Sequence, residues 1–158
     1  MPWISTVTYD LIKPKIESFI ALLHSKSITN ISIVGFCWGS WCAFKTIAEF
    51  PNAIKAAAIV HPAVHLEQYA YNGDIEALSK KIHVPTLVLP AGNDPDIYRA
   101  GGVIVDTLKA NNPKSSWTDE FKDMTHGFVP RGDIADSNVD AKVKLAMQQV
   151  ADFIIANA

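Results

Sequence analysis

Hydrophobic positions follow two different patterns along the chain. Some form short continuous runs rich in β-branched residues, and others recur every three or four positions over longer stretches. Runs of the first kind predict buried strands, and stretches of the second kind predict amphipathic helices. The strands are predicted at 31–36, 56–60, 84–90 and 116–121, and the helices at 8–25, 38–50, 75–80, 97–110 and 139–156.

The alternation of these elements predicts an α/β fold. Strands separated by helices favour a parallel sheet with right-handed crossovers and with helices on both faces. A length of 158 residues favours one domain over residues 1–158, and 49% apolar residues suit a buried core. Pro14 lies inside the first helical pattern and is an alternative start for that helix, because proline is favoured in a first turn.

Charge and composition exclude several classes of protein. The net charge is −2 and no basic cluster occurs, so nucleic acid is not an expected partner. No apolar run approaches the roughly 18 residues of a membrane helix, and the first residues do not resemble a signal peptide. Cys37 and Cys42 would point in different directions on a helix, so we expect no disulfide between them. These features predict a soluble protein of a reducing compartment, the cytoplasm.

The sequence Gly-Phe-Cys-Trp-Gly at 35–39 lies between a predicted strand and a predicted helix. This is the Gly-x-nucleophile-x-Gly form of a nucleophile elbow, in which Gly35 and Gly39 leave room for a sharp turn. The start of the following helix favours a thiolate at Cys37, and the Trp38 N–H is a candidate oxyanion-hole donor. The alternative is a buried core cysteine in a glycine-containing turn.

Asp94 and His126 also come directly after predicted strands. The carboxyl ends of parallel strands meet at one edge of a sheet, so we expect both side chains to lie near Cys37. The chain order of nucleophile, acid and histidine is that of the α/β-hydrolases. Asp96 is a competing acid, and an aspartate beside glycine and proline is also typical of a plain turn. The alternative for His126 is a surface histidine on a loop, and the chain order argues against it.

The remaining histidines carry weaker signals. His61 ends a predicted strand at the same sheet edge, where it would line a pocket. His61 and His65 are spaced as a metal-binding pair would be, but no carboxylate completes the set, so we predict no metal site. Three further residues are expected to have no catalytic role, two on the surface and one in core packing: His24, His83 and Cys42.

Taken together, four segments resemble the dienelactone hydrolase family in its eukaryotic, carboxymethylenebutenolidase-like form. The resemblance runs from about residue 8 to the end of the chain. The segments are Gly-Phe-Cys-Trp-Gly at 35–39, His61-Pro62, Gly92-Asn93-Asp94, and His126-Gly127-Phe128 followed by Arg131.

The resemblance implies an α/β-hydrolase that opens a lactone or cleaves a carboxylic ester without a cofactor. Cys37 would attack the carbonyl carbon, His126 would act as base and Asp94 would orient the histidine. The position of the family's aspartate favours Asp94 over Asp96. The resemblance also implies a small-molecule substrate, held in a pocket that is lined by His61, Phe128 and Arg131.

The position of the elbow departs from the family pattern. The family's cysteine follows the fifth strand, whereas Cys37 is preceded by room for only one helix. We therefore expect an N-terminally truncated domain that lacks the second oxyanion donor and the groups that hold a substrate carboxylate. The strand from Ile31 to Phe36 would then be an exposed edge, which a second copy of the chain could cover.

Two rival interpretations remain at this stage. A truncated hydrolase fold with impaired catalysis could serve as a binding or interaction module. A cysteine-dependent redox protein is less favoured, because the chain has no Cys-x-x-Cys pair and Cys42 is poorly placed to resolve an oxidised Cys37.

Overall fold

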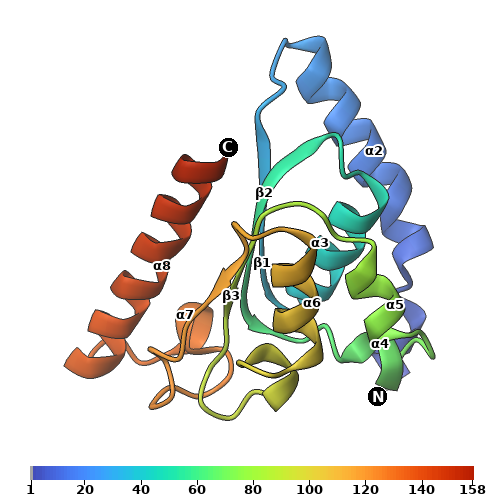
Figure 1. The fold of residues 1–158 in the computed structure, drawn as a ribbon. Helices are drawn as coiled ribbons and strands as arrows, with labels where there is room; N and C mark the ends of the chain where they lie inside the picture. Colours follow the sequence, from blue (N-terminus) through green and yellow to red (C-terminus); the bar gives the residue numbers. More distant parts are fainter. Residues whose placement is uncertain (1) are drawn as a thin grey trace.

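A computed structural model describes residues 2–158 and contains one parallel sheet (Figure 1). The strands are β1 (Ile31–Cys37), β2 (Ile54–Pro62), β3 (Thr86–Leu89) and β4 (Ser116–Trp117). They lie in chain order, so each hydrogen-bonds to its neighbour and β1 and β4 form the two edges. The predicted parallel sheet is confirmed.

Helices cover both faces of this sheet (Figure 1). One face packs against α3 (Trp38–Glu49), α5 (Ile75–Lys80) and α6 (Val103–Asn111). The other packs against α7 (Phe128–Arg131) and α8 (Ser137–Asn157). The remaining helical segments are α1 (Pro2–Thr6), α2 (Tyr9–Ser25), α4 (Leu66–Tyr69) and the 3-10 turn η1 (Asp96–Tyr98).

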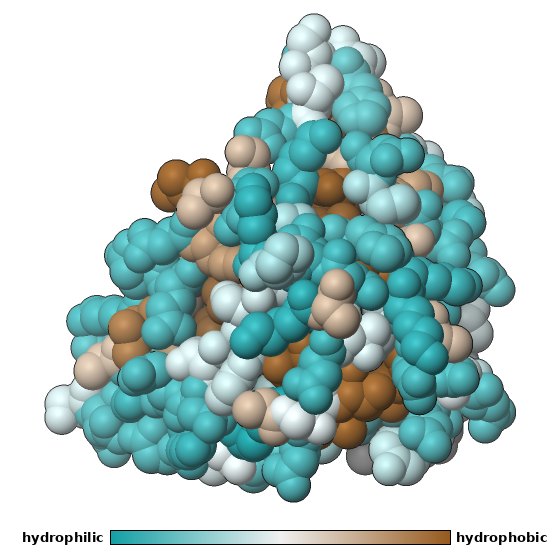
Figure 2. Space-filling model, in the orientation of Figure 1, coloured by the Kyte–Doolittle hydropathy of each residue, from teal (hydrophilic) through white to brown (hydrophobic). Residues whose placement is uncertain are grey.

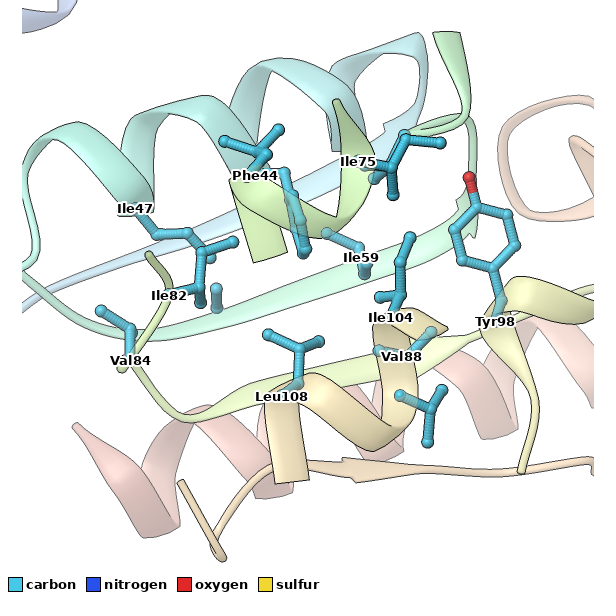
Figure 3. Packing of buried hydrophobic residues seen from close by; sticks show 14 of the residues in the cluster. Phe44, Ile47, Ile59, Ile75, Ile82, Val84, Val88, Tyr98, Ile104 and Leu108 are labelled. Carbon is cyan, nitrogen blue, oxygen red and sulfur yellow. The ribbon is translucent and has the colours of Figure 1, made fainter. Parts of the chain in front are cut away.

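The sheet separates two hydrophobic cores, and β2 contributes to both. Ala57 and Ile59 face the core below α3, α5 and α6, whereas Ala58 and Val60 face the core below α7 and α8. A strand buried on both faces reads as a continuous apolar run, which is why periodicity identified β2. Figure 3 shows the first core, in which side chains from α3, α5 and α6 meet those of β2 and β3.

Helix α2 differs from the sequence-based expectation in two ways. It begins at Tyr9, so Pro14 lies inside the helix and does not start it. Leu11 and Phe19 belong to the apolar positions whose helical spacing predicts an amphipathic helix at 8–25, yet they are 61% and 60% exposed. Only Tyr9 and Ile20 of this helix are buried. The physical reason is that α2 packs against α3 beside the edge strand, so a narrow stripe of the helix finds a partner.

Two other predicted elements are shorter than expected. The helix predicted at 97–110 is divided into η1 and α6 at the Gly101–Gly102 pair, where helix propensity is lowest. The fourth strand ends at Trp117 instead of residue 121, because the chain turns and buries Phe121 in the core below α8.

The surface is mainly hydrophilic on the face shown in Figure 2, with hydrophobic residues in separate patches. Within residues 2–158, none of the helices combines the length and hydropathy needed to cross a bilayer. Cys37 and Cys42 are both free thiols, as predicted.

Candidate active site

Cys37 occupies the junction between β1 and α3 in a strained backbone conformation. It is the last residue of β1 and the N-cap of α3, with φ of +50° and ψ of −123°. A residue with a Cβ rarely adopts such a positive φ, so its neighbours must hold it there. The Ser40 hydroxyl and the Ala63 N–H both donate to the Cys37 carbonyl oxygen, and Ala63 N–H also lies 2.9 Å from Ser40 Oγ. Ser40 was not predicted as a site residue; its only signal was a polar side chain beside the elbow.

The two elbow glycines have different roles. A Cβ on Gly35 would lie 2.5 Å from Ser40 Cα and 2.6 Å from the Gly39 carbonyl oxygen, so the strand can meet the helix only with glycine at 35. A Cβ on Gly39 would meet no described atom within 4 Å. The steric expectation is therefore confirmed at Gly35 and wrong at Gly39.

Asp94 and His126 come together at the carboxyl end of the sheet. His126 Nδ1 lies 2.6 Å from Asp94 Oδ1, and Asp94 Oδ2 accepts a hydrogen bond of 2.7 Å from the Ala91 N–H. Asp94 is buried, so its interaction with the imidazole is weakly screened. Asp96 points away, with a side chain that is 99% exposed. The structure thus pairs His126 with Asp94, which sequence reasoning had left in competition with Asp96.

A close contact between two loops brings these residues into register. Gly92, after β3, donates its N–H to the Met124 carbonyl oxygen at 2.8 Å. A Cβ on Gly92 would overlap the Lys122 carbonyl oxygen, so the loops could not approach as closely with a larger residue. Asn93 Oδ1 also accepts a hydrogen bond of 2.6 Å from the His126 N–H. Sequence reasoning missed Asn93, although it lies beside Asp94 in the quoted motif.

The surroundings of His126 favour its charged form. A hydrogen bond to Asp94 raises the pKa of His126 to about 9; burial opposes this shift, and a further hydrogen bond with the Cys37 side chain adds to it. Because Nδ1 is taken by Asp94, Nε2 is the nitrogen left for Cys37. A cationic imidazole beside the sulfur stabilises a thiolate. The His126 imidazole is therefore held by the Asp94 carboxylate on one side and interacts with the Cys37 side chain on the other.

His61, at the end of β2, lies against His126 but is closed to solvent. Its side chain is 0% exposed, and its ring centre lies 5.1 Å from that of His126 with the planes at 68°. Neither ring nitrogen has a hydrogen-bond partner among the described residues. Burial, and secondarily the nearby His126, lower the pKa of His61 to about 4. His61 is thus a neutral, buried neighbour of His126.

The other predicted pocket residues lie on α7. Phe128 is buried and stacks on Phe121, with ring centres 5.2 Å apart, so it anchors the loop that carries His126. Arg131 is exposed and its guanidinium lies where a Cβ on Gly127 would be. A positive group is therefore available beside the loop that carries His126.

The predicted oxyanion donor, Trp38, is the first residue of α3, so its N–H has no acceptor within the helix. Its indole donates to the Tyr71 hydroxyl at 3.0 Å, and that hydroxyl lies 2.8 Å from the Ile4 carbonyl oxygen. Trp3 of α1 lies beside the same indole, with ring centres 6.0 Å apart. Tyr71 and Trp3 had no sequence signal, because they come from segments without a recognisable motif.

His65, which is four residues after His61, has its contact with Tyr98. Its Nδ1 lies 2.9 Å from the Tyr98 hydroxyl, and its backbone N–H donates to the same oxygen. Figure 3 shows the Tyr98 ring at one side of the labelled core residues. Within residues 2–158, no group of three or more histidine, cysteine, aspartate or glutamate side chains could hold a metal ion.

Comparison with known proteins identifies the family of the chain. The sequence profile of the Dienelactone hydrolase family matches residues 3–157. The chain belongs to this family. The parallel sheet with helices on both sides is consistent with the α/β-hydrolase-type fold of dienelactone hydrolase family members.

Two curated relatives carry the description "Carboxymethylenebutenolidase homolog". The protein from Rattus norvegicus is 24% identical over 131 residues, which cover 82% of this chain and 49% of the relative. The protein from Mus musculus gives the same identity and coverage. This dienelactone hydrolase family member thus spans about half the length of the curated relatives it matches.

Proposed function

We propose that this dienelactone hydrolase family member hydrolyses a carboxylic ester or lactone through Cys37, His126 and Asp94. The observation that carries the proposal is the position of His126, whose Nδ1 lies 2.6 Å from Asp94 Oδ1 and whose charged form is favoured by Asp94 and by the Cys37 side chain. The strained backbone of Cys37 and the family membership support it. The description of the rat and mouse relatives suggests a lactone as one substrate class.

The reaction follows from these roles in two halves. Cys37 and His126 react as a thiolate–imidazolium pair, in which the imidazolium holds the proton that the thiol has given up, and the sulfur attacks the carbonyl carbon to form a tetrahedral oxyanion. The Trp38 N–H donates to that oxyanion. As the C–O bond breaks, His126 returns the proton to the departing alkoxide, which leaves a thioester on Cys37. Water, deprotonated by His126, then attacks the thioester, and breakage of the C–S bond releases the carboxylic acid and restores the Cys37 thiolate beside the protonated His126.

Arg131 suggests what kind of substrate is preferred. Its guanidinium is exposed and lies beside the loop of His126. In this proposal it pairs with an anionic group of the substrate, as guanidinium groups do with carboxylates. Asp94 fixes the ring nitrogen that faces Cys37.

Replacement of the nucleophile tests the proposal directly. Cys37→Ala should lower hydrolysis of p-nitrophenyl acetate and of a small lactone by about 10⁴-fold, because the covalent step is lost. The matched control is Cys42→Ala, which removes a half-buried thiol whose pKa is raised by burial. The control should keep the wild-type rate. Hydrolysis by Cys37→Ala at the wild-type rate would refute the proposal.

A second measurement separates an enzyme from an inert binding module. Iodoacetamide should alkylate Cys37 faster than Cys42 at neutral pH, because His126 stabilises the thiolate. Equally slow alkylation of both cysteines, together with undetectable hydrolysis, would favour a module that binds without catalysis.

We also propose that a second copy of the chain covers the open side of β1. This strand has no partner on that side among the described residues, and α2 beside it exposes Leu11, Phe19 and Leu22. An apolar groove of about 300 Å³ lies between α2 and β1, with Ile31 and Ile33 in its lining.

We assign the protein to the cytoplasm, because a reducing compartment keeps Cys37 a free thiol.

A further inference from the structure

His61 is an anomaly beside the candidate active site. Its side chain is completely buried, yet Nδ1 and Nε2 both lack a hydrogen-bond partner among the described residues. Buried polar atoms are nearly always paired, because an unpaired one has lost its hydration without compensation. Its backbone adds to the cost, with a φ of +35° at a residue that has a Cβ. A side chain of this kind at this position calls for an explanation beyond core packing.

Three aromatic rings surround His61, and each comes from a different element. Phe36 lies before Cys37 on β1, with ring centres 5.9 Å apart. Phe128 of α7 lies 5.8 Å away, in an edge-to-face arrangement. His126 is the nearest, at 5.1 Å. His61 is therefore the contact through which β1, β2 and the start of α7 meet the imidazole of His126.

The His126 side chain requires such a contact. Its hydrogen bond to Asp94 holds only Nδ1, so the ring could still turn about that bond and move Nε2 away from Cys37. A second ring packed at 68° against it blocks this turn. A flexible aliphatic side chain would fill the space without presenting a rigid face.

We propose that His61 is a positioning residue that holds the His126 ring so that Nε2 faces Cys37 while Nδ1 faces Asp94. The inference rests on the proposed function, because it assigns His61 a role in the same triad. It differs from the expectation that His61 lines the substrate pocket. The ring acts as a rigid wall against His126 and does not touch the substrate.

The charges around His61 agree with this role. The ionisable groups that face it are His126, Asp94 and Arg131. Burial keeps His61 neutral near neutral pH, so it does not repel the protonated ring of His126. In this proposal the His61 ring acts through its shape. An uncharged ring of similar size should therefore be able to replace it.

Substitution of His61 in a Cys42→Ala background tests the proposal. His61→Leu removes the ring, and His61→Phe keeps a flat ring without nitrogens. The rate of Cys37 alkylation by iodoacetamide would be measured from pH 5 to 10 by mass spectrometry. We expect His61→Leu to lower the rate at pH 7 by about tenfold or more, because a misplaced His126 no longer stabilises the thiolate. His61→Phe should stay within about threefold of the parent protein.

Proton NMR provides a readout that does not depend on Cys37 chemistry. The Nδ1 proton shared by His126 and Asp94 should give a downfield resonance that persists in His61→Phe and broadens or disappears in folded His61→Leu.

A purely structural role would lower the melting temperature of His61→Leu without changing the alkylation profile or this resonance, and that result overturns the proposal. If His61→Leu does not fold, His61→Phe decides: loss of the alkylation rate and of the resonance overturns the proposal. An absence of ester hydrolysis in the parent protein and in both His61 variants would count against the proposed function. The resonance would still report where His126 lies.

Discussion

At the scale of single residues, the candidate site depends on how one histidine is surrounded. His126 combines a buried carboxylate on Nδ1 with a thiol on the other side of the ring. Each partner favours the cationic imidazole, and burial alone would oppose it. The arrangement therefore couples the charge of His126 to the folded state, which has a consequence for stability.

The stability of the protein should fall as pH rises from neutral to alkaline. The folded-state pKa of His126 is about 9 and its ordinary value is 6.5, so folding favours the protonated ring. The resulting stabilisation is complete below about pH 6.5 and is lost as pH rises through about 9. Melting temperatures measured between pH 6 and 9.5 should therefore decline more steeply for wild type than for Asp94→Asn.

The control for this experiment is His24→Gln, which changes an exposed histidine on α2. Its melting temperature should follow the wild-type pH profile. Parallel profiles for wild type and Asp94→Asn would show that the two side chains are not coupled in the folded protein.

At the scale of elements, the junction between β1 and α3 places the nucleophile. The strand and helix approach so closely at Gly35 that a methyl group would touch Ser40 and Gly39. Ser40 in turn connects the Cys37 carbonyl group to Ala63 beyond the end of β2. These hydrogen bonds connect β1, α3 and the residue after β2 close to Cys37.

Alanine substitutions at the two elbow glycines should have opposite effects on stability. Gly35→Ala should lower the free energy of unfolding by about 1–3 kcal/mol, because the added methyl group pushes α3 away from β1. A methyl group at position 39 would meet no described atom within 4 Å, and alanine favours a helix more than glycine does. Gly39→Ala should therefore raise the free energy of unfolding by about 0.5–1 kcal/mol. Urea denaturation of both variants measures the difference. Equal effects at the two positions would contradict the close approach at Gly35.

At the scale of the whole molecule, the site lies at one end of a sheet with an open edge. Cys37, Asp94 and His126 come from the ends of β1 and β3 and from the loop after β4. The side of β1 away from β2 is free within the described residues, and α2 exposes apolar side chains next to it. An exposed strand edge is a ready template for pairing with another chain.

Size-exclusion chromatography with light scattering should therefore show a dimer. Phe19→Lys on α2 should shift the protein to a monomer, because a charge enters the apolar surface beside β1. The matched control is Ile155→Lys on α8, which alters a side chain that is 78% exposed on the other face of the sheet. The control should remain dimeric. A monomeric wild type at micromolar concentration would refute association through β1.

Local pattern was sufficient for the order of elements, the parallel sheet and the elbow. A strand buried on both faces reads as an apolar run, and a nucleophile elbow needs glycine at a specific step, so both features are written in neighbouring residues. Chain order also placed an acid and a histidine at the correct sheet edge. The exposed face of α2 was misjudged because helical periodicity does not reveal how wide a partner surface the helix will find.

Tertiary structure decided the features that depend on distant contacts. It placed Asp94 Oδ1 2.6 Å from His126 Nδ1 and left the Asp96 side chain 99% exposed, although the two residues are only two positions apart. It buried His61 against the same imidazole, since the bend at the end of β2 turns the ring inward. Such contacts join residues far apart in the chain, so they follow from packing and leave no local signature in the sequence.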